Sequence, residues 1–358
     1  MSEIGRYRVG IVGCGAISRN HLEGFRAIPE ARLVGVCDVD AGRARETADR
    51  WGIEGAFGSV EQLLAAGVDI VSVCTPHPTH EAVVLAAAAA GVHVLCEKPI
   101  ATELASAERM IAACDEARVK LGVLFQRRFW PAAQRLRAAI DDGTLGRPIL
   151  GHVSVLLHRD PAYYTAWRGT WTGDGGGVLM SQAVHHIDLL QWLMGEAVEV
   201  HGHIGTFAHS IEVEDTAAAV VKFASGAMAT ISATTAATPN LGETIRITGE
   251  TGATAELTEF PEGTDGRITL WARHAEIQSE PVHPAGIDPN VDLSAINRQL
   301  VPHHGAQVRD FVDALREGRD PAITGRGATA ALRILLAVYE SSRTGQPVRL
   351  APALADKN

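Results

Sequence analysis

The chain has 358 residues, of which 46% are hydrophobic, and 32 basic against 42 acidic side chains give a net charge of −10. This length exceeds one typical domain and predicts two. The negative charge argues against nucleic acid or an anionic membrane surface as a partner, and no apolar run approaches the length of a membrane span. The first residues lack the apolar stretch of a secretory signal, so we expect a cytoplasmic protein.

Cysteine and histidine usage gives no sign of cross-links or metal. The five cysteines all lie in the first third of the chain, and none forms a C-x-x-C pair. An odd number of thiols without that spacing favours reduced, packed side chains over disulfides or zinc. The fifteen histidines show no spacing typical of a ligand set, so we expect no metal site.

Short apolar runs alternate with alanine-rich helical stretches in the first third of the chain. The predicted strands are 8–12, 33–37, 70–74, 92–96 and 121–125, and the predicted helices are 17–27, 41–50, 80–90 and 103–117. Buried parallel strands read as continuous apolar runs, and their alternation with helices predicts a doubly wound α/β domain. We assign residues 1–128 to it.

The pattern changes after a predicted helix at 132–140. Alternating strands are predicted at 150–157, 198–207, 217–223, 227–234, 244–248, 254–257 and 268–272, with helices at 177–194, 306–317 and 328–342. Ser225-Gly226 and Glu250-Thr251-Gly252 are typical of hairpin turns, and residues 280–300 read as a long loop. Residues 129–358 are therefore expected to form an α+β domain.

A glycine turn follows the first predicted strand and indicates a dinucleotide site. Gly13 permits a tight turn, Gly15 lets the backbone approach a pyrophosphate, and Ser18 stands at the third position instead of glycine. Asp38 ends the second strand about twenty residues on, where a carboxylate binds ribose hydroxyls and repels a 2′-phosphate, which favours NAD over NADP. The alternative is that Asp38 caps the next helix, a role Asp40 could fill equally well. The cofactor-binding residues predicted here are Gly13, Gly15, Ala16, Ile17 and Asp38.

Two further segments follow strands of the same predicted sheet. Lys98-Pro99 closes the strand at 92–96, and ligands of open parallel sheets bind beyond the carboxyl ends of the strands, so Lys98 should point at the reactive end of the cofactor. Pro99 is a candidate for a cis peptide bond. The loop that begins at Thr75 fits either nicotinamide contact or an ordinary strand-to-helix turn. These segments add Thr75, Pro76, His77, His80, Glu97 and Lys98 to the predicted cofactor site.

A glycine run, Gly175–Gly177, leads into the helix predicted at 177–194. Ser181, His185 and Asp188 share one face of this helix, whereas His186 points about 100° away from its neighbour. A hydrolase triad is disfavoured because the chain has no G-x-S-x-G elbow. His185 is either a functional imidazole or a structural histidine whose ring is hydrogen-bonded within the protein.

The segment from Tyr163 to Trp171 concentrates aromatic side chains around Arg168 in a chain that is only 5% aromatic. Aromatic faces stack on sugar rings, and an arginine binds hydroxyls or a carboxylate. The alternative is a hydrophobic staple beneath a long loop.

Together these residues resemble the Gfo/Idh/MocA oxidoreductases, which include glucose–fructose oxidoreductase and inositol dehydrogenase. The resemblance spans essentially the whole chain and rests on the following segments: Gly13–Ser18 with His21, Cys74-Thr75-Pro76, Glu97-Lys98-Pro99, Arg128-Phe129, Gly175–Gly177 with His185-His186-Ile187-Asp188, Gly325-Arg326-Gly327 and Tyr339-Glu340-Ser341-Ser342. It implies a Rossmann domain followed by a domain with an open, mostly antiparallel mixed sheet flanked by helices. It also implies nicotinamide-dependent oxidation of a sugar or cyclitol hydroxyl, with Lys98 and His185 as the catalytic residues.

The resemblance leaves the reaction and several roles open. Family dehydrogenases often carry Asp where this chain has Ser181, which leaves open whether His185 or Lys98 is the base, with His185 favoured. The alternatives to an NAD-linked dehydrogenase are a redox-neutral glycosidase or lyase that retains NAD, and a non-enzymatic NAD sensor. The family's usual self-association predicts a homodimer or homotetramer. The substrate-binding residues predicted are Arg128, Tyr163, Trp167, Arg168, Ser181, His185 and His304.

Overall fold

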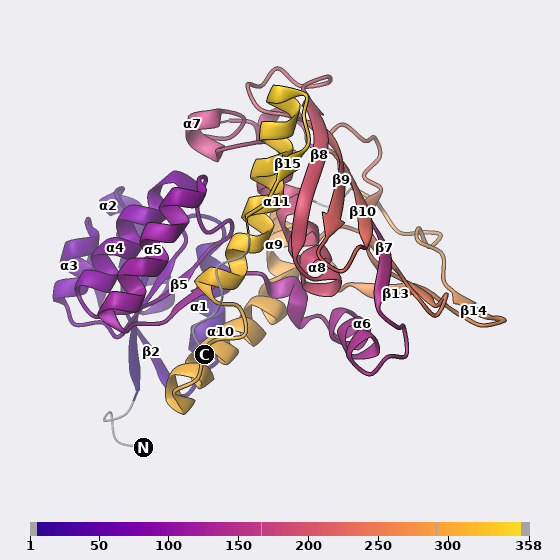
Figure 1. Ribbon diagram of the computed structural model, residues 1–358. Coiled ribbons are helices and arrows are strands. Elements are labelled where there is room, and N and C mark those ends of the chain that lie inside the picture. Colours follow the sequence, from indigo (N-terminus) through magenta and orange to yellow (C-terminus); the bar gives the residue numbers. More distant parts are fainter. Residues whose placement is uncertain (1–5, 166, 291, 352–358) are drawn as a thin grey trace. The chain divides into compact units, whose positions relative to one another are not determined.

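The computed structural model describes residues 6–165, 167–290 and 292–351, and its internal contacts divide the chain into two units (Figure 1). The first unit runs to Gln126 and also contains Asn297–Ala328, while the second contains Arg127–Ile296 and the chain from Thr329 onward. Our sequence analysis set one boundary at residue 128. The contacts divide the chain after Gln126 and assign a later segment, residues 297–328, to the first unit.

The first unit is built on a six-stranded parallel sheet with the strand order β3-β2-β1-β4-β5-β6. Its strands are β1 (Tyr7–Val12), β2 (Ala31–Cys37), β3 (Gly55–Phe57), β4 (Ile70–Val73), β5 (His93–Cys96) and β6 (Leu121–Val123). The order reverses between β1 and β4, and in open parallel sheets the crevice for a dinucleotide lies at the carboxyl ends beside that reversal. The predicted doubly wound Rossmann arrangement is confirmed.

Helices connect these strands. They are α1 (Ser18–Arg26), α2 (Ala41–Trp51), α3 (Val60–Ala65), the short 3-10 helix η1 (His77–Thr79), α4 (His80–Ala89) and α5 (Leu104–Ala117). The four predicted helices are present, but β3 and α3 were not predicted. Strand β3 has only three residues and no long apolar run, whereas α3 carries a signal we overlooked. Its N-cap is Ser59, whose hydroxyl accepts the backbone N–H of Gln62.

The helix α10 (Val301–Glu317) joins the first unit although it lies far along the chain. It packs on α1, where Gly24 lies so close that a Cβ there would be 3.4 Å from the Cα of Gly305. Val308 and Phe311 of α10 are fully buried in the hydrophobic core of this unit. This packing explains why residues 297–328 belong to the unit that contains the six-stranded parallel sheet.

The second unit is built on a nine-stranded mixed sheet with the order β14-β13-β12-β11-β7-β10-β9-β8-β15. Its strands are β7 (Pro148–Leu156), β8 (Ala197–Gly205), β9 (Thr216–Phe223), β10 (Met228–Thr234), β11 (Gly242–Gly249), β12 (Thr254–Glu259), β13 (Arg267–Arg273), β14 (Glu276–Ser279) and β15 (Val348–Arg349). Strands β7 and β10 pair in parallel and the other pairs are antiparallel. The expected open, mostly antiparallel sheet and both hairpin turns are confirmed.

The helices of this part of the chain are α6 (Pro131–Asp141), the 3-10 helix η3 (Pro161–Tyr163), α7 (Trp171–Asp174), the π-helical turn η4 (Leu179–Ala183), α8 (Val184–Met194), α9 (Leu293–Gln299) and α11 (Gly325–Thr344). Helix α11 runs along β8, because Ser341 and Ser342 accept backbone N–H groups of that strand (Figure 1). The predicted loop at 280–300 was wrong in part, since α9 begins within it and is capped by the carboxylate of Asp292.

The described residues contain no helix long and apolar enough to span a bilayer. All five cysteines are buried and none is cross-linked, so the prediction of packed, reduced thiols is confirmed.

Candidate functional site

The glycine turn between β1 and α1 has the geometry of an anion cradle. Gly13 has φ +92°, and a Cβ at this position would lie 2.7 Å from the carbonyl carbon of Cys74, so only glycine fits. Gly15 is exposed, and the space where its Cβ would be is empty to 4 Å. Helix α1 begins without a side-chain cap, and the N–H groups of Ser18 and Asn20 donate to the carbonyl oxygens of Gly15 and Ile17. Ala16 and Ile17 complete this turn, and the residues present fit a dinucleotide pyrophosphate.

Asp38 lies at the end of β2 and is held by the backbone of the glycine turn. Its carboxylate accepts the N–H of Cys14 at 2.9 Å and the N–H of Asp40 at 2.9 Å. The cap of α2 is Asp40, which accepts two backbone N–H groups of the helix. Of the two roles weighed for Asp38, capping therefore belongs to Asp40. Arg43 lies 3.6 Å from the Asp38 carboxylate.

The segment after β4 is fixed to the segment after β5 by one buried histidine. The ring of His80 faces the carbonyl oxygen of Thr75 at 3.0 Å and that of Pro99 at 3.1 Å. His77 stacks edge-on against the His80 ring, and Pro76 beside it is exposed. The Lys98–Pro99 bond is cis, as the sequence suggested. His80 thus joins the two loops that the sequence analysis placed at the cofactor.

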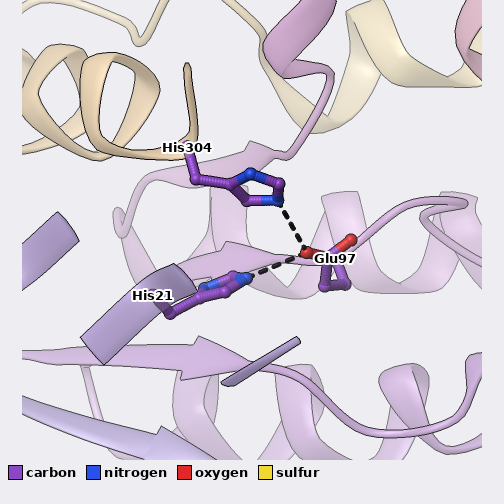
Figure 2. A group of neighbouring side chains, drawn as sticks. All are labelled: His21, Glu97 and His304. Carbon is purple, nitrogen blue, oxygen red and sulfur yellow. Dashed lines mark hydrogen bonds and ion pairs between the residues drawn. The ribbon is translucent and has the colours of Figure 1, made fainter. Parts of the chain in front are cut away.

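A buried carboxylate stands beside Lys98, between two imidazole rings (Figure 2). One oxygen of Glu97 lies 2.9 Å from Nε2 of His21 and 3.6 Å from Nε2 of His304, while the other accepts the backbone N–H of Lys98 at 3.0 Å. His21 comes from α1 and His304 from α10. Glu97 therefore ties two helices to the strand end that carries the lysine.

The protons of this cluster can be placed from its outer contacts. His304 Nδ1 lies 3.0 Å from the carbonyl oxygen of Leu300, which can only accept, so Nδ1 carries a proton. Burial raises the pKa of Glu97, but the hydrogen bonds and charges of His21 and His304 outweigh burial and hold this pKa well below its usual range. Burial lowers the pKa of His21. The carboxylate is thus kept ionised.

In the second unit, the glycine run before η4 is fixed by buried Glu214. Its carboxylate accepts the backbone N–H of Gly177 at 2.8 Å and of Leu179 at 3.0 Å, and it accepts the hydroxyl of Tyr339 at 3.0 Å. A Cβ on Gly177 would lie 1.8 Å from the carbonyl oxygen of Glu214, so glycine is required for this approach. Burial outweighs these hydrogen bonds and raises the pKa of Glu214 to about 7.

The helix predicted at 177–194 is not a uniform α-helix, because it opens with the π turn η4. Ser181 lies in this π turn, whereas His185 and Asp188 lie three residues apart on α8. Ser181 donates its hydroxyl to Asp174 at 3.2 Å, whereas Asp188 forms a bidentate ion pair with Arg128 at 2.6 and 2.7 Å. His185 is 7% exposed.

His186, the neighbour of His185, belongs to a separate buried charge cluster. Its Nδ1 lies 2.6 Å from Glu243, and Arg127 pairs with both Glu243 and Glu259 at 2.8 and 2.6 Å. Burial raises the pKa of Glu259 to about 8 and lowers that of His186. Two groups of three ligand-capable residues thus have their ligand atoms within 4.8 Å of one another, a spacing that would also admit a divalent cation: His21, Glu97 and His304; and His186, Glu243 and Glu259.

The aromatic segment gathers around Arg168. The guanidinium lies 4.7 Å from the ring centre of Tyr163 and 4.9 Å from that of Trp167. The hydroxyl of Tyr163 accepts a hydrogen bond from Gln182 in η4 at 2.8 Å. This contact joins the aromatic segment to the helix that carries His185.

The structure therefore groups most of the predicted residues within each unit. Gly13, Gly15, Asp38, Thr75, His80, Glu97 and Lys98 lie at the carboxyl edge of the first sheet with His304, and Tyr163, Trp167, Arg168 and Ser181 lie with η4. Arg128 is instead paired with Asp188. Sequence reasoning missed Asp174 and Glu214. The partners of Glu214 (Gly177, Leu179 and Tyr339) are distant in sequence, whereas those of Asp174 (Gly169 and Ser181) are near. A buried acid directly before a glycine run was a signal available for Asp174.

Comparison with known proteins places both halves of the chain. Residues 7–125 match the family described as the oxidoreductase family with an NAD-binding Rossmann fold, and residues 133–255 match the GFO/IDH/MocA C-terminal domain. D-apiose dehydrogenase of Paraburkholderia graminis is 29% identical over 96% of this chain and 90% of its own length. Myo-inositol 2-dehydrogenase of Thermotoga maritima is 34% identical over 68% of this chain and 73% of its own length.

A solved structure extends the likeness. The WlbA dehydrogenase of Bordetella pertussis, determined with NADH and UDP-GlcNAcA, superposes with a TM-score of 0.83, is 34% identical, and aligns with 97% of this chain and 99% of its own. The family match and this superposition confirm the fold predicted from the motifs.

The raised pKa of Glu214 predicts a pH-dependent stability difference. The folded carboxyl takes up a proton near pH 7 and the unfolded one near 4.5, so between these values the folded state binds more protons and gains stability as the pH falls. Glu214→Gln removes this uptake. Urea titrations give the free energy of unfolding of the variant minus that of wild type at each pH. This difference should be about 2–4 kcal/mol larger at pH 8 than at pH 5.

The control for this measurement is Glu212→Gln, because Glu212 is exposed. It should show the same difference from wild type at both pH values. A Glu214→Gln difference that does not change with pH would contradict a folded carboxyl titrating near neutrality.

Proposed function

The chain belongs to the GFO/IDH/MocA oxidoreductases, an enzyme family with an NAD-binding Rossmann fold, and from this membership we propose that it transfers hydride between NAD and a secondary hydroxyl or ketone of a sugar, glycoside or cyclitol. The observation that carries the proposal is Lys98 at the carboxyl end of β5, held by ionised Glu97. The relatives named for D-apiose and myo-inositol support a polyol substrate.

The dinucleotide would be held by the glycine turn and Asp38. The open space at Gly15 and the uncapped start of α1 suit the pyrophosphate, and the remaining lone pairs of the Asp38 carboxylate suit ribose hydroxyls. When bound, NAD supplies the carbon that accepts hydride. Thr75, Pro76 and His77 stand at the same edge of the sheet and would flank the nicotinamide end.

Lys98 would stabilise charge on the substrate oxygen, and His185 would accept the hydroxyl proton. The ammonium of Lys98 binds the substrate oxygen and stabilises negative charge that develops there as the O–H proton leaves. His185 takes that proton while the substrate C–H bond breaks with its electron pair. Because Nδ1 of His185 is buried, we assign Nε2 as the ring nitrogen that accepts the substrate proton. Ser181, donating to Asp174, would orient the substrate beside this histidine.

Removing the amine tests the role of Lys98. Lys98→Ala should lower kcat for sugar-dependent NAD reduction at least about a hundredfold while NAD still binds, because the developing charge on the substrate oxygen loses its counter-ion. NADH absorbance and product are followed together over a panel of pyranoses, inositols and glycosides. Lys222→Ala, at an exposed lysine of β9, is the control and should retain full turnover.

Two outcomes would overturn this part of the proposal. Near-normal turnover in Lys98→Ala would remove the role of the lysine. Product formed without accumulation of NADH would favour the redox-neutral glycosidase or lyase.

We propose NAD over NADP on the charge of Asp38. Asp38→Asn should lower the ratio of kcat/KM for NAD to that for NADP at least about tenfold, because a carboxylate repels the 2′-phosphate and an amide does not. Asp40→Asn is the matched control, since it caps α2 two residues away and should leave the ratio unchanged. A ratio insensitive to Asp38→Asn would assign cofactor preference elsewhere.

We propose that a second copy of the chain covers one face of the second sheet. Leu150 and Met228 are paired across β7 and β10 and are 51% and 50% exposed, with Val220 of β9 45% exposed nearby. Single apolar side chains on a surface are common, but three neighbouring ones on one sheet suit self-association.

Light scattering tests this interface. The wild type should measure as a dimer or tetramer, and Met228→Lys should lower its mass at micromolar concentration by burying an unpaired charge. Val39→Lys, at a residue 98% exposed in the first unit, is the control. A monomeric wild type would refute the proposal. We also propose a cytoplasmic location, supported by the five unbridged cysteines and testable by cell fractionation.

A further inference from the structure

Arg168 differs from the buried arginines of its unit in what it contacts. Arg127, Arg128 and Arg159 each form an ion pair with a carboxylate, at 2.8, 2.6 and 2.5 Å respectively. Arg168 is partly buried, and within the described ranges its guanidinium contacts the rings of Tyr163 and Trp167 and has no carboxylate at ion-pair distance. A guanidinium remains charged at all physiological pH values. Among the residues that the structure describes, its charge therefore has no carboxylate partner.

Two aromatic rings lie against the guanidinium of Arg168. Each ring lies within 5 Å of the guanidinium carbon, so aromatic surface replaces water over the planar group. The N–H donors of an arginine lie in its plane, in a fork that matches two oxygens of a carboxylate or phosphate. Arg159 lies 5.2 Å from the same Tyr163 ring, but its charge is paired with the carboxylate of Glu262. The arrangement favours an anion.

The backbone around Arg168 is held in place. The N–H of Gly169 donates to the buried carboxylate of Asp174 at 2.7 Å, and the carbonyl of Gly169 accepts the N–H of Glu212 at 2.9 Å. Gly169 has φ +81°, which glycine adopts without strain. Asp174 also accepts the hydroxyl of Ser181, so one carboxylate anchors both the Arg168 loop and η4. The position of the guanidinium is thus set by the same acid that fixes the helix leading to His185.

We propose that Arg168 is the subsite for an anionic group on the substrate, so that the enzyme acts on an acidic sugar bearing a carboxylate or a phosphate. This inference rests on the proposed hydride transfer and narrows its substrate class. Tyr163 and Trp167 position the arginine and cover the sugar ring, and the Arg168 fork binds the anion.

Steady-state kinetics with NAD and three sugars tests the subsite: glucuronate, glucose 6-phosphate and glucose. The wild type should prefer at least one anionic sugar over glucose in kcat/KM. Arg168→Ala should reduce that preference at least about thirtyfold, mainly through KM, because a desolvated charge loses its partner. Arg168→Lys keeps the charge without the planar fork and should give an intermediate preference. The two anionic arms show whether carboxylate or phosphate is bound.

Arg135→Ala is the matched control. Arg135 also stacks on an aromatic ring, Trp271 at 5.0 Å, but on α6, and its removal should leave the preference unchanged. Equal kcat/KM for glucose and both anions, or a preference that survives Arg168→Ala, would overturn the proposal and leave the dehydrogenase assignment intact.

A binding measurement separates this proposal from the activity on which it rests. The shift in unfolding midpoint caused by glucuronate or glucose 6-phosphate, with NAD present, is compared between wild type and Arg168→Ala. The midpoint shift could depend on Arg168 while none of the sugars supports NAD reduction. That outcome would refute the proposed function and keep the subsite. Shifts that are equal in the two proteins would refute the subsite.

Discussion

The ionised carboxylate of Glu97 is the constraint on which the first unit depends. Its two oxygens are divided between the imidazoles of His21 and His304 and the backbone of Lys98. An unpaired buried charge is strongly unfavourable, so this position requires both helices, α1 and α10, to dock. The same contacts fix the backbone of the residue to which we assign the substrate oxygen. Stability and positioning of the lysine therefore come from one interaction.

The second unit uses buried acids in a comparable way. Glu214 accepts backbone N–H groups of the glycine run and of η4, and Asp174 accepts the N–H of Gly169 and the hydroxyl of Ser181. Arg127, Arg128 and Arg159 are each paired with a carboxylate, whereas Arg168 has none at ion-pair distance among the described residues. Because the other three guanidinium groups each have a carboxylate partner, the different surroundings of Arg168 support the proposed anion subsite.

The sequence predicted the elements whose signal is local. The apolar runs predicted five strands of the first sheet, and the alternation after residue 148 predicted β7 to β13 of the second but neither β14 nor β15. It failed where few residues form an element, as in β3, or where a cap rather than periodicity starts a helix, as at Ser59 and Asp292. The π turn at Leu179–Ala183 was invisible because hydrophobic spacing does not report one inserted residue.

Sequence motifs identified candidate site residues, but they did not predict which of these residues contact one another. Glu97 and Lys98 could be placed at a strand end, but the meeting of His21, Glu97 and His304 needs α10 to return to the first unit, and no local pattern encodes that return. Arg128 shows the converse, since its place in a motif suggested ligand binding while its guanidinium is paired with Asp188.

The central claim is that Lys98 and His185 act in one hydride-transfer event, and a double-mutant cycle on single-turnover NADH formation tests it most directly. If the two groups serve the same transition state, the Lys98→Ala/His185→Ala double variant should be about as slow as the slower single variant. Rate losses that multiply would contradict the claim, because independent groups lower the barrier separately.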